Sequence, residues 1–331
     1  MLYRLTTREI SRAESGKPYT SGATMSQMWQ IKCAKDSAKA LLPFQRQLRR
    51  LKDSMVGYKR EPKKDRNTVR DGLALIDWLG NVAGANVLEV GSGWQPMIPI
   101  LFSLAGAKVY LTDMYPLMRG DTFRAALDAI RESREEIIAR LHIPADALDR
   151  VTRECSDAEM EGRLKELRFE YLAPCDCRRL DLSPGSVDVV MSRAVLEHIS
   201  PDVIDGIFRE AHRLLPPGGR MIHLVDHSDH WSHRDPSIDA VNFLRYPDWL
   251  FSLTCINPQN YQNRLRHSQY RTMLESAGFA VKSEERTVDP QCLESVLKMQ
   301  SNRTIAEKFQ SFGQEDLATV NSILLAERLP D

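Results

Sequence analysis

A run rich in histidine and aspartate, residues 223–235, holds the strongest candidates for chemistry on a substrate. Histidine is the side chain whose pKa best suits proton transfer at neutral pH, and a neighbouring carboxylate can orient its ring. His227 and Asp226 lie closest to the end of a predicted strand, so we predict that they act at the reaction centre, with His227 as general base. His230, further along the run, is predicted to contact the substrate.

Two other interpretations of this run stay open. His227, His230 and His233 are acceptable metal ligands together with a carboxylate, but their spacing matches no known zinc motif, and we predict no metal. Alternatively, these polar groups only fix the loop, because histidines often tie loops together. His223 alternates differently along the strand and is predicted to lie in the core.

Further polar side chains are candidates for the same substrate side. His198 is a second candidate base, although a histidine at a helix start can also serve only in capping or packing. Asn263, Arg264 and Arg266 occur in one short stretch and are predicted to bind the substrate. A guanidinium group can clamp a carboxylate or phosphate. The alternative for the arginines is ion pairing with the acidic segment 116–168.

A glycine-rich turn indicates a nucleoside ligand. Gly91 and Gly93 close a short apolar run, where they let the backbone turn sharply and approach a ligand. Asp113 ends the next predicted strand, and a carboxylate there can accept hydrogen bonds from both ribose hydroxyls. A dinucleotide site would need glycine or alanine at position 96, where this chain has Pro96. The pattern therefore disfavours NAD.

Four motifs, spread over residues 87–226, resemble those of class I S-adenosylmethionine (SAM)-dependent methyltransferases of the small-molecule type. Val87–Gly93 (VLEVGSG) resembles the family's first motif, and the segment beginning at Asp176 resembles its acidic adenine loop. Asp188–Ile199 resembles the fourth strand and the "LEH" helix start, and Arg213–Gly219 resembles the turn before the fifth strand. The resemblance covers under half the chain and implies a Rossmann-like fold with SAM as cofactor.

The resemblance also implies which residues hold the cofactor. Glu89 supports the glycine loop, which lines the methionine and ribose of SAM. Asp113 binds the ribose hydroxyls, and Met114 packs on the adenine. The full set implied to bind SAM is Glu89, Gly91, Gly93, Asp113, Met114, Asp176, Cys177, Ser192 and Arg193.

The later members of this set have roles at both ends of the cofactor. By the resemblance, Asp176 accepts a hydrogen bond from the adenine amino group, and the backbone N–H of Cys177 meets a ring nitrogen. Many relatives carry alanine at the position of Cys177, and a small thiol fits the same space. Ser192 and Arg193 are expected beside the methionine end.

Short apolar strands alternate with amphipathic helices along most of the chain, which predicts an α/β fold. We expect a Rossmann-like, mostly parallel seven-stranded sheet with helices on both faces. The predicted division is an N-terminal helical cap or lid over residues 1–80 and a SAM-binding domain over 81–331. Its insertions, at about 116–168 and 227–266, are long enough to act as lids or binding loops. The predicted strands are 85–91, 108–112, 169–172, 187–192, 220–225, 279–285 and 321–327.

Composition excludes little. The chain has 45 basic and 45 acidic side chains, which gives no argument for nucleic acid or membrane binding. Residues 1–70 hold 17 Lys/Arg against 6 Asp/Glu, but these alternate with apolar residues as on a solvated helix face. No apolar signal region or segment of ~20 apolar residues occurs, and the cysteines match no zinc or disulfide pattern. We expect a cytoplasmic protein with reduced thiols.

These observations together predict a SAM-dependent methyltransferase of the EC 2.1.1 type. The expected acceptor is an oxygen or nitrogen of a small polar molecule of natural-product or sugar type. One alternative consumes SAM by cyclisation or elimination on the same fold. Another is a methyltransferase acting on RNA or protein, or a non-catalytic partner with this fold. A small-molecule acceptor is the expected partner, membrane and nucleic acid are disfavoured, and a homodimer is left open.

Overall fold

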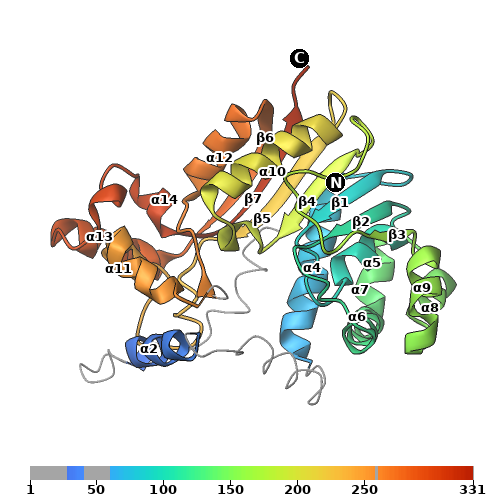
Figure 1. Ribbon diagram of the computed structural model, residues 1–331, viewed down its shortest axis with the longest axis horizontal. Coiled ribbons are helices and arrows are strands. Elements are labelled where there is room, and N and C mark those ends of the chain that lie inside the picture. The colour runs from blue at the N-terminus through green and yellow to red at the C-terminus, as the bar shows by residue number, and fades with distance from the viewer. Residues whose placement is uncertain (1–27, 41–59, 258–259, 331) are drawn as a thin grey trace.

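A seven-stranded sheet organises the residues that the computed structural model describes, which are 28–40, 60–257 and 260–330. The strand order is β3-β2-β1-β4-β5-β7-β6, and β7 runs antiparallel to both of its neighbours (Figure 1). This confirms the predicted mostly parallel α/β sheet. The strands are β1 (Asn86–Val90), β2 (Lys108–Thr112), β3 (Phe169–Tyr171), β4 (Val189–Arg193), β5 (Arg220–Asp226), β6 (Phe279–Val288) and β7 (Thr319–Arg328).

The order of the strands reverses between β1 and β4. β1 pairs in parallel with β2 on one side and with β4 on the other, so that Leu88 lies opposite both Tyr110 and Val190. In open α/β sheets, ligands bind at the carboxyl ends of the strands where the order reverses. The carboxyl ends of β1, β4 and β5 are therefore where a site is expected.

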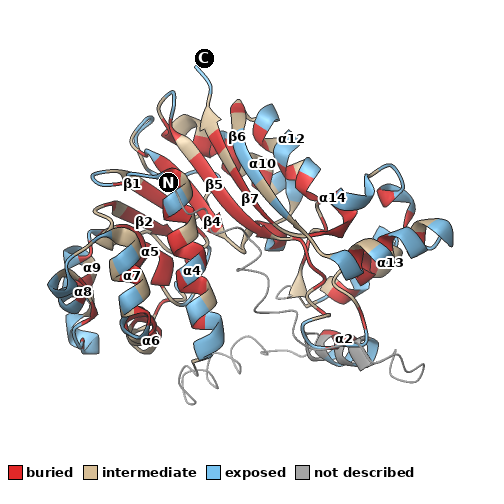
Figure 2. Ribbon diagram, turned by 180° about the vertical axis from the view of Figure 1, so that it is seen from behind, coloured by how far each residue is buried: buried red, intermediate tan, exposed pale blue. Residues whose placement is uncertain are grey.

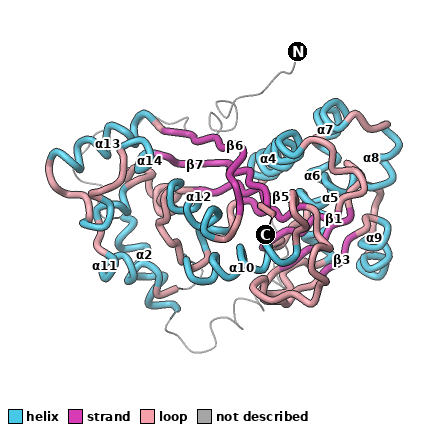
Figure 3. The backbone as a smooth tube through the Cα atoms, turned by 90° about the horizontal axis from the view of Figure 1, so that it is seen from above, coloured by secondary structure: helices cyan, strands magenta, loops and turns pink. Residues whose placement is uncertain are grey.

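Helices cover both faces of the sheet, and the strands between them are largely buried (Figures 2 and 3). Successive strand residues face opposite layers, as expected for a parallel sheet buried on both sides. Val87 belongs to the cluster that includes α4–α6, whereas Leu88 belongs to the cluster that includes α10 and α12. The helices of these layers are α4 (Pro62–Leu79), α5 (Met97–Leu104), α6 (Gly120–Glu132), α10 (Pro201–Leu214) and α12 (His267–Ser276).

The insertion between β2 and β3 is helical and consists of several short helices, which are interrupted at Ser133 and again after Thr152. These pieces pack beside α6 and add apolar side chains to its face of the sheet. They are α7 (Arg134–Leu141), α8 (Ala145–Thr152), a short 3-10 turn (Asp157–Glu159) and α9 (Met160–Glu166). Within the described ranges, we find no helix with the length and apolar character needed to cross a membrane.

The described parts of the first 80 residues lie in two different places. α4 packs against α5, α6 and β5, with Leu73 and Ile76 buried in the core, so it covers the sheet itself. α2 (Met28–Ala40) lies next to the 3-10 turn η4 (Leu253–Cys255), where Cys33 packs with Trp231. Most other residues of the predicted cap lie outside the described ranges, and the division at residue 80 stays a prediction.

A separate apolar cluster joins the 227–266 insertion to the segment between β6 and β7 (Figure 1). Phe243 and Phe251 come from the insertion, whereas Val296 and Phe309 come from residues 290–318. The elements of this lobe are the 3-10 turn η3 (Asn242–Arg245), α11 (Asp248–Ser252), α13 (Pro290–Ser301), η6 (Glu307–Phe309) and α14 (Gln314–Ala318).

Arg266 holds this lobe to the sheet. Its side chain is fully buried, and its guanidinium donates to the carbonyl oxygens of His227 at 3.0 Å and Leu317 at 3.1 Å, and also to that of Thr319. Desolvation lowers its pKa to about 10, which still leaves the group charged at neutral pH. One guanidinium thus satisfies carbonyls both from the end of β5 and from the junction of α14 with β7.

We expect Arg266→Met to lower the free energy of unfolding by about 3–5 kcal/mol, because several buried carbonyls would lose their donor. Urea unfolding followed by circular dichroism measures this change. Arg209→Met is the control, because Arg209 is exposed in a surface pair with Asp205, and we expect a change within about 0.5 kcal/mol. Equal stability of the two variants would contradict the structural role of Arg266.

Candidate functional site

The glycine loop after β1 has the backbone that its sequence predicts. Gly91 and Gly93 have φ values of 75° and 63°, which favour glycine. A Cβ on Gly91 would lie 2.6 Å from Cγ1 of Val195, so the loop packs closely against the end of β4. A Cβ on Gly93 would meet nothing within 4 Å, and this side of the loop is therefore open to a ligand.

Asp113 is held in place by the same loop. Its Oδ2 accepts a hydrogen bond from the Gly93 N–H at 3.0 Å, and its Oδ1 accepts one from the Tyr115 N–H at 2.9 Å. Each carboxylate oxygen keeps a further lone pair, and the side chain is only partly buried. The carboxylate can thus accept two hydroxyl groups, as the predicted ribose contact requires. Met114 beside it is 59% exposed, which leaves its side chain available to an apolar ring.

Glu89 lies under the loop at the end of β1. Its side chain is buried, and Oε2 has no hydrogen-bond partner among the described residues. Burial raises its pKa to about 7, and the charge of Asp113 adds to this rise while Ser92 acts against it. A cationic group in the loop would stabilise the ionised form of Glu89.

Asp176 and Cys177, the two residues predicted to contact the adenine, differ in whether their hydrogen-bonding groups are already occupied. The exposed Asp176 carboxylate pairs with Arg178 at 2.6 Å, so an adenine amino group would have to share it, and this pairing lowers the pKa of Asp176. The thiol of Cys177 donates to Thr112 Oγ1 at 3.1 Å and turns toward β2. Its backbone N–H is not used by that contact, which is compatible with the predicted role.

At the methionine end the structure corrects one prediction. The Ser192 side chain is fully buried and bonded to His223 Nδ1 at 2.8 Å, so it cannot line an open pocket. Burial lowers the pKa of His223 to about 3 and keeps its ring neutral in the core, as expected for that residue. Arg193 pairs through Nη2 with Asp71 of α4 at 2.6 Å. The other oxygen of Asp71, Oδ1, is buried and has no hydrogen-bond partner within the part of the chain that the structure describes. Asp71, on a helix assigned to the cap, gave no signal in the sequence.

On the acceptor side, the ends of β4 and β5 bring together two histidines and two carboxylates. One ligand-type atom from each of Glu197, His198 and His230 lies within 4.8 Å of the others. Asp226 Oδ2 lies 3.3 Å from His230 Nε2. Burial opposes ionisation of Asp226, but the nearby His230 and the Ser228 hydroxyl and amide keep its pKa below its usual value. Sequence reasoning missed Glu197, although it directly precedes His198.

A cavity of about 220 Å³ opens beside these histidines. The ring of His198 lies 4.9 Å from that of His230, which stacks on His233 at 5.3 Å. This wall offers ring nitrogens, whereas Trp231 and Phe251 supply apolar surface. The cavity is lined by His198, His230, Trp231, His233, Arg234, Phe251, Asn260 and Gln262.

His227 does not reach this cavity, which corrects its assignment as general base. The side chain is buried, and its two ring nitrogens bond to the Leu265 carbonyl at 3.1 Å and to Ser322 Oγ at 2.8 Å. Burial lowers its pKa to about 3, and the charge of Arg266 contributes. With both nitrogens occupied inside the protein, His227 ties the loop to β7.

The predicted substrate residues in 263–266 are also structural. Arg264 is buried, donates to the carbonyl oxygens of Phe243 and Tyr246, and pairs with Asp248. Arg266 has the role described above, and neither guanidinium can clamp a substrate anion. Asn263 donates to two backbone carbonyls next to the Glu197–His198 turn, both at 2.8 Å. These three residues therefore position the site without facing the cavity.

The comparisons with known proteins agree with the loop and sheet. The model of a family described as "Methyltransferase domain" matches residues 45–284. The chain belongs to this methyltransferase family. The membership confirms the predicted resemblance and, with it, SAM as the cofactor. No protein with curated annotation matches the chain in sequence.

Solved structures similar to this methyltransferase are remote. One is phosphoethanolamine N-methyltransferase 2 of Haemonchus contortus with phosphomonomethylethanolamine and S-adenosylhomocysteine, 20% identical over 79% of this chain and 53% of that one, at a TM-score of 0.43. Another is a putative sarcosine dimethylglycine methyltransferase of Galdieria sulphuraria, 13% identical over 83% and 92%, at 0.45. A third is the [4+2]-cyclase SpnF, 15% identical over 80% and 82%, at 0.44. The chain spans about half the length of the first, and such scores give no information on its acceptor.

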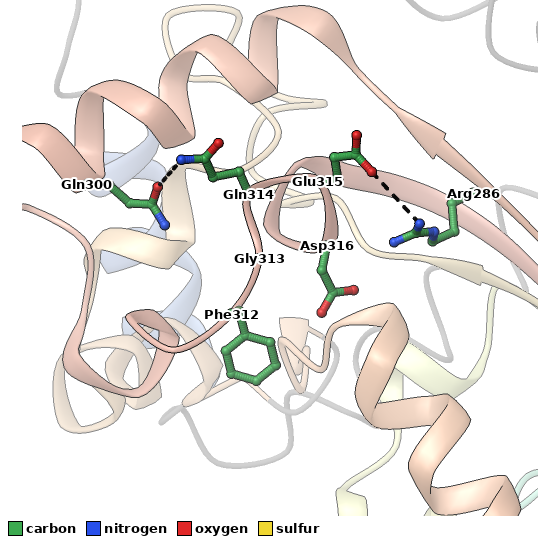
Figure 4. A pocket seen from close by; sticks show the side chains of 7 residues that line it. All are labelled: Arg286, Gln300, Phe312, Gly313, Gln314, Glu315 and Asp316. Carbon is green, nitrogen blue, oxygen red and sulfur yellow. Dashed lines mark hydrogen bonds and ion pairs between the residues drawn. The ribbon is translucent and has the colours of Figure 1, made fainter.

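A larger hollow, of about 590 Å³, shares no lining residue with the cavity beside His198 and His230. Figure 4 shows it between α13, α14 and β6, with Arg286 directed toward Glu315 and Gln314 bonded to Gln300. Its other carboxylate, Asp316, accepts from Ser268. The polar side chains of this hollow are paired with other protein side chains, so we do not assign it as the candidate active site.

Two glycine variants test the assigned cofactor loop. Gly93→Ala should lower affinity for S-adenosylhomocysteine by roughly tenfold or more, since its Cβ would enter the open space of the loop, at a stability cost of about 1–2 kcal/mol. Gly91→Ala should cost about 2–4 kcal/mol of stability through its clash with Val195. Calorimetry and urea unfolding measure both effects.

Gly84→Ala is the matched control for Gly93→Ala. Gly84 has a φ of 78° and an equally open Cβ position, but it lies in the turn before β1. It should show the same backbone strain with no loss of affinity. A similar loss of affinity in both variants would refute the assigned loop.

Proposed function

We propose that this protein transfers the methyl group of SAM to an oxygen or nitrogen atom of a small polar acceptor. The observation that carries the proposal is the cavity of about 220 Å³ lined by His198 and His230, from the segments that follow β4 and β5. Val195, three residues before His198, packs against Gly91 of the glycine loop. Drug-sized ligands occupy roughly 300–1,000 Å³. A cavity of this size therefore suits a small acceptor better than a segment of RNA or protein.

The cofactor is proposed to lie across the glycine loop. Gly93 leaves space for the ribose, Asp113 accepts its hydroxyls, and Met114 covers the adenine. The sulfonium end would then point past Gly91 toward Val195, which precedes the Glu197–His198 turn. Favourable attraction between the positive sulfonium and the buried Glu89 would assist this orientation.

Methyl transfer from a sulfonium is an in-line displacement. The acceptor atom forms a bond to the methyl carbon as the carbon–sulfur bond breaks and S-adenosylhomocysteine leaves. The proton that a hydroxyl or amine acceptor loses can pass to Nε2 of His198, whose Nδ1 is bonded to the Tyr261 carbonyl. The protein mainly has to align the two molecules and exclude water. His198 and His230 can hydrogen-bond the acceptor, while Trp231 and Phe251 pack against its apolar part.

We expect Asp113→Ala to weaken S-adenosylhomocysteine binding by about 1–3 kcal/mol, because the ribose hydroxyls would lose a charged hydrogen-bond acceptor. Asp176→Ala should have a smaller effect, since Arg178 already occupies that carboxylate. Calorimetry on both variants measures this order. The exposed Asp181→Ala serves as the control, and wild-type affinity in Asp113→Ala would refute the assigned pocket.

Product analysis tests the reaction. With SAM and a panel of small polar hydroxyl and amine acceptors, we expect S-adenosylhomocysteine and a methylated acceptor in equal amounts by mass spectrometry. His198→Ala should lower turnover while leaving cofactor affinity within about threefold, because it lies on the acceptor side. Release of methylthioadenosine from SAM alone would instead show cyclisation or elimination and contradict methyl transfer.

A further inference from the structure

We propose that Glu197, His198 and His230 bind one divalent transition-metal ion, of the kind that accepts two imidazoles and a carboxylate, such as zinc, iron(II) or manganese(II). Their ligand atoms lie within 4.8 Å of one another. Ligands around one ion at roughly 2.1 Å are about 3.4 Å apart. His198 and His230 have partly exposed rings, so a small rotation closes the set. The metal set considered from the sequence combined His230 with His227 and His233, whereas the proposed set combines it with Glu197 and His198.

The buried Glu197 carboxylate is the first argument for a cation here. The residue is 2% exposed, and neither carboxylate oxygen has a hydrogen-bond partner in the described part of the chain. An unpaired carboxylate without donors is costly to bury, and buried charges are normally paired or bound to metals. Arg193, at the end of the same strand, is already paired with Asp71. A metal ion would supply the missing positive charge.

The hydrogen bond of His198 is the second argument. Its Nδ1 lies 2.9 Å from the carbonyl oxygen of Tyr261, and a carbonyl can only accept, so Nδ1 must carry the proton. In the neutral ring this leaves the lone pair on Nε2. Histidines that bind metals commonly donate their other N–H to a carbonyl or carboxylate, which fixes the ring orientation.

His230 and Asp226 complete the arrangement. Among the described residues His230 Nε2 has no hydrogen-bond partner, although Asp226 Oδ2 lies 3.3 Å away, within ion-pair range. Asp226 is itself oriented by the N–H and hydroxyl of Ser228, at 2.8 and 2.6 Å. This carboxylate can act as a fourth ligand or orient the others. Both histidines line the cavity, so a metal ion held by them would be open to it.

The open side of the site gives the metal a role, which rests on the proposed function. A metal with a position open to the cavity can bind an oxygen of the acceptor and lower its pKa. The hydroxyl proton would pass to water in the cavity, and the oxygen would attack the SAM methyl carbon as the carbon–sulfur bond breaks and S-adenosylhomocysteine leaves. This favours acceptors with a hydroxyl group over simple amines.

Metal titration of the whole protein tests the site. After chelator treatment and desalting, we expect zinc(II) to bind one-to-one by calorimetry, and cobalt(II) to give a visible d–d absorption. His198→Ala, His230→Ala and Glu197→Gln should each raise the zinc Kd by roughly tenfold or more. Zinc should raise the Tm of the wild type but not of Glu197→Gln. This last variant removes the buried charge at nearly constant shape, so it is the one expected to stay folded.

His142→Ala controls for adventitious binding, because His142 is exposed and distant in sequence from the cluster, and its zinc Kd should equal that of the wild type. Failure of the wild type to bind one equivalent, or unchanged affinity in Glu197→Gln and His230→Ala, would overturn the site. S-adenosylhomocysteine binding is measured on the same samples. Metal binding without cofactor binding would refute the proposed function alone, whereas the reverse would refute the metal site alone.

Discussion

Carboxylates collect at the carboxyl edge of the sheet, and the need to balance their charge shapes the rest of the site. Glu89 ends β1, Asp113 follows β2, Glu197 follows β4 and Asp226 ends β5. They act on one another, because Asp113 contributes to the raised pKa of Glu89 and Asp226 to that of Glu197, both mainly raised by burial. An edge that gathers so many carboxylates is suited to positively charged ligands, because a cation bound there would favour their ionised forms. The sulfonium of SAM is one such ligand, and the proposed metal ion would be a second.

The arginines nearest to this edge are engaged elsewhere, which keeps the site negative. Arg193 is committed to Asp71, and through it α4 is fastened to β4. Arg264 satisfies backbone carbonyls inside the 241–318 lobe, and Arg266 satisfies carbonyls where the lobe meets β5 and β7, so both positive charges stabilise the fold. These guanidinium groups are poor ligands for a substrate anion by energy alone. If either one turned toward a substrate, the buried carbonyls that it now satisfies would lose their hydrogen-bond donor. The prediction that Arg264 and Arg266 bind an anionic group of the substrate is therefore wrong, and both residues have structural roles.

What could be predicted from the sequence was local. The glycine loop, Asp113 and most strands depend on short-range backbone preferences and on strand order, and the structure agrees with them. The environment of His227 could not be predicted, because its partners Leu265 and Ser322 are 38 and 95 residues away. The sequence pattern of histidines after a strand is the same whether their rings point into the core or into a cavity. That choice is made by the packing of the 241–318 lobe, which no local pattern encodes.

The two halves of the site share one piece of backbone. Gly91 lies against Val195, which is followed directly by the 3-10 turn Leu196–His198. Asn263 holds the same turn through the carbonyls of Leu196 and Ile199. A shift of the cofactor loop would therefore displace Glu197 and His198, because the contacts between them are closely packed. Because both ligand sites are anchored to this turn, cofactor and acceptor can be aligned by a few residues of rigid main chain, which is what an in-line transfer demands.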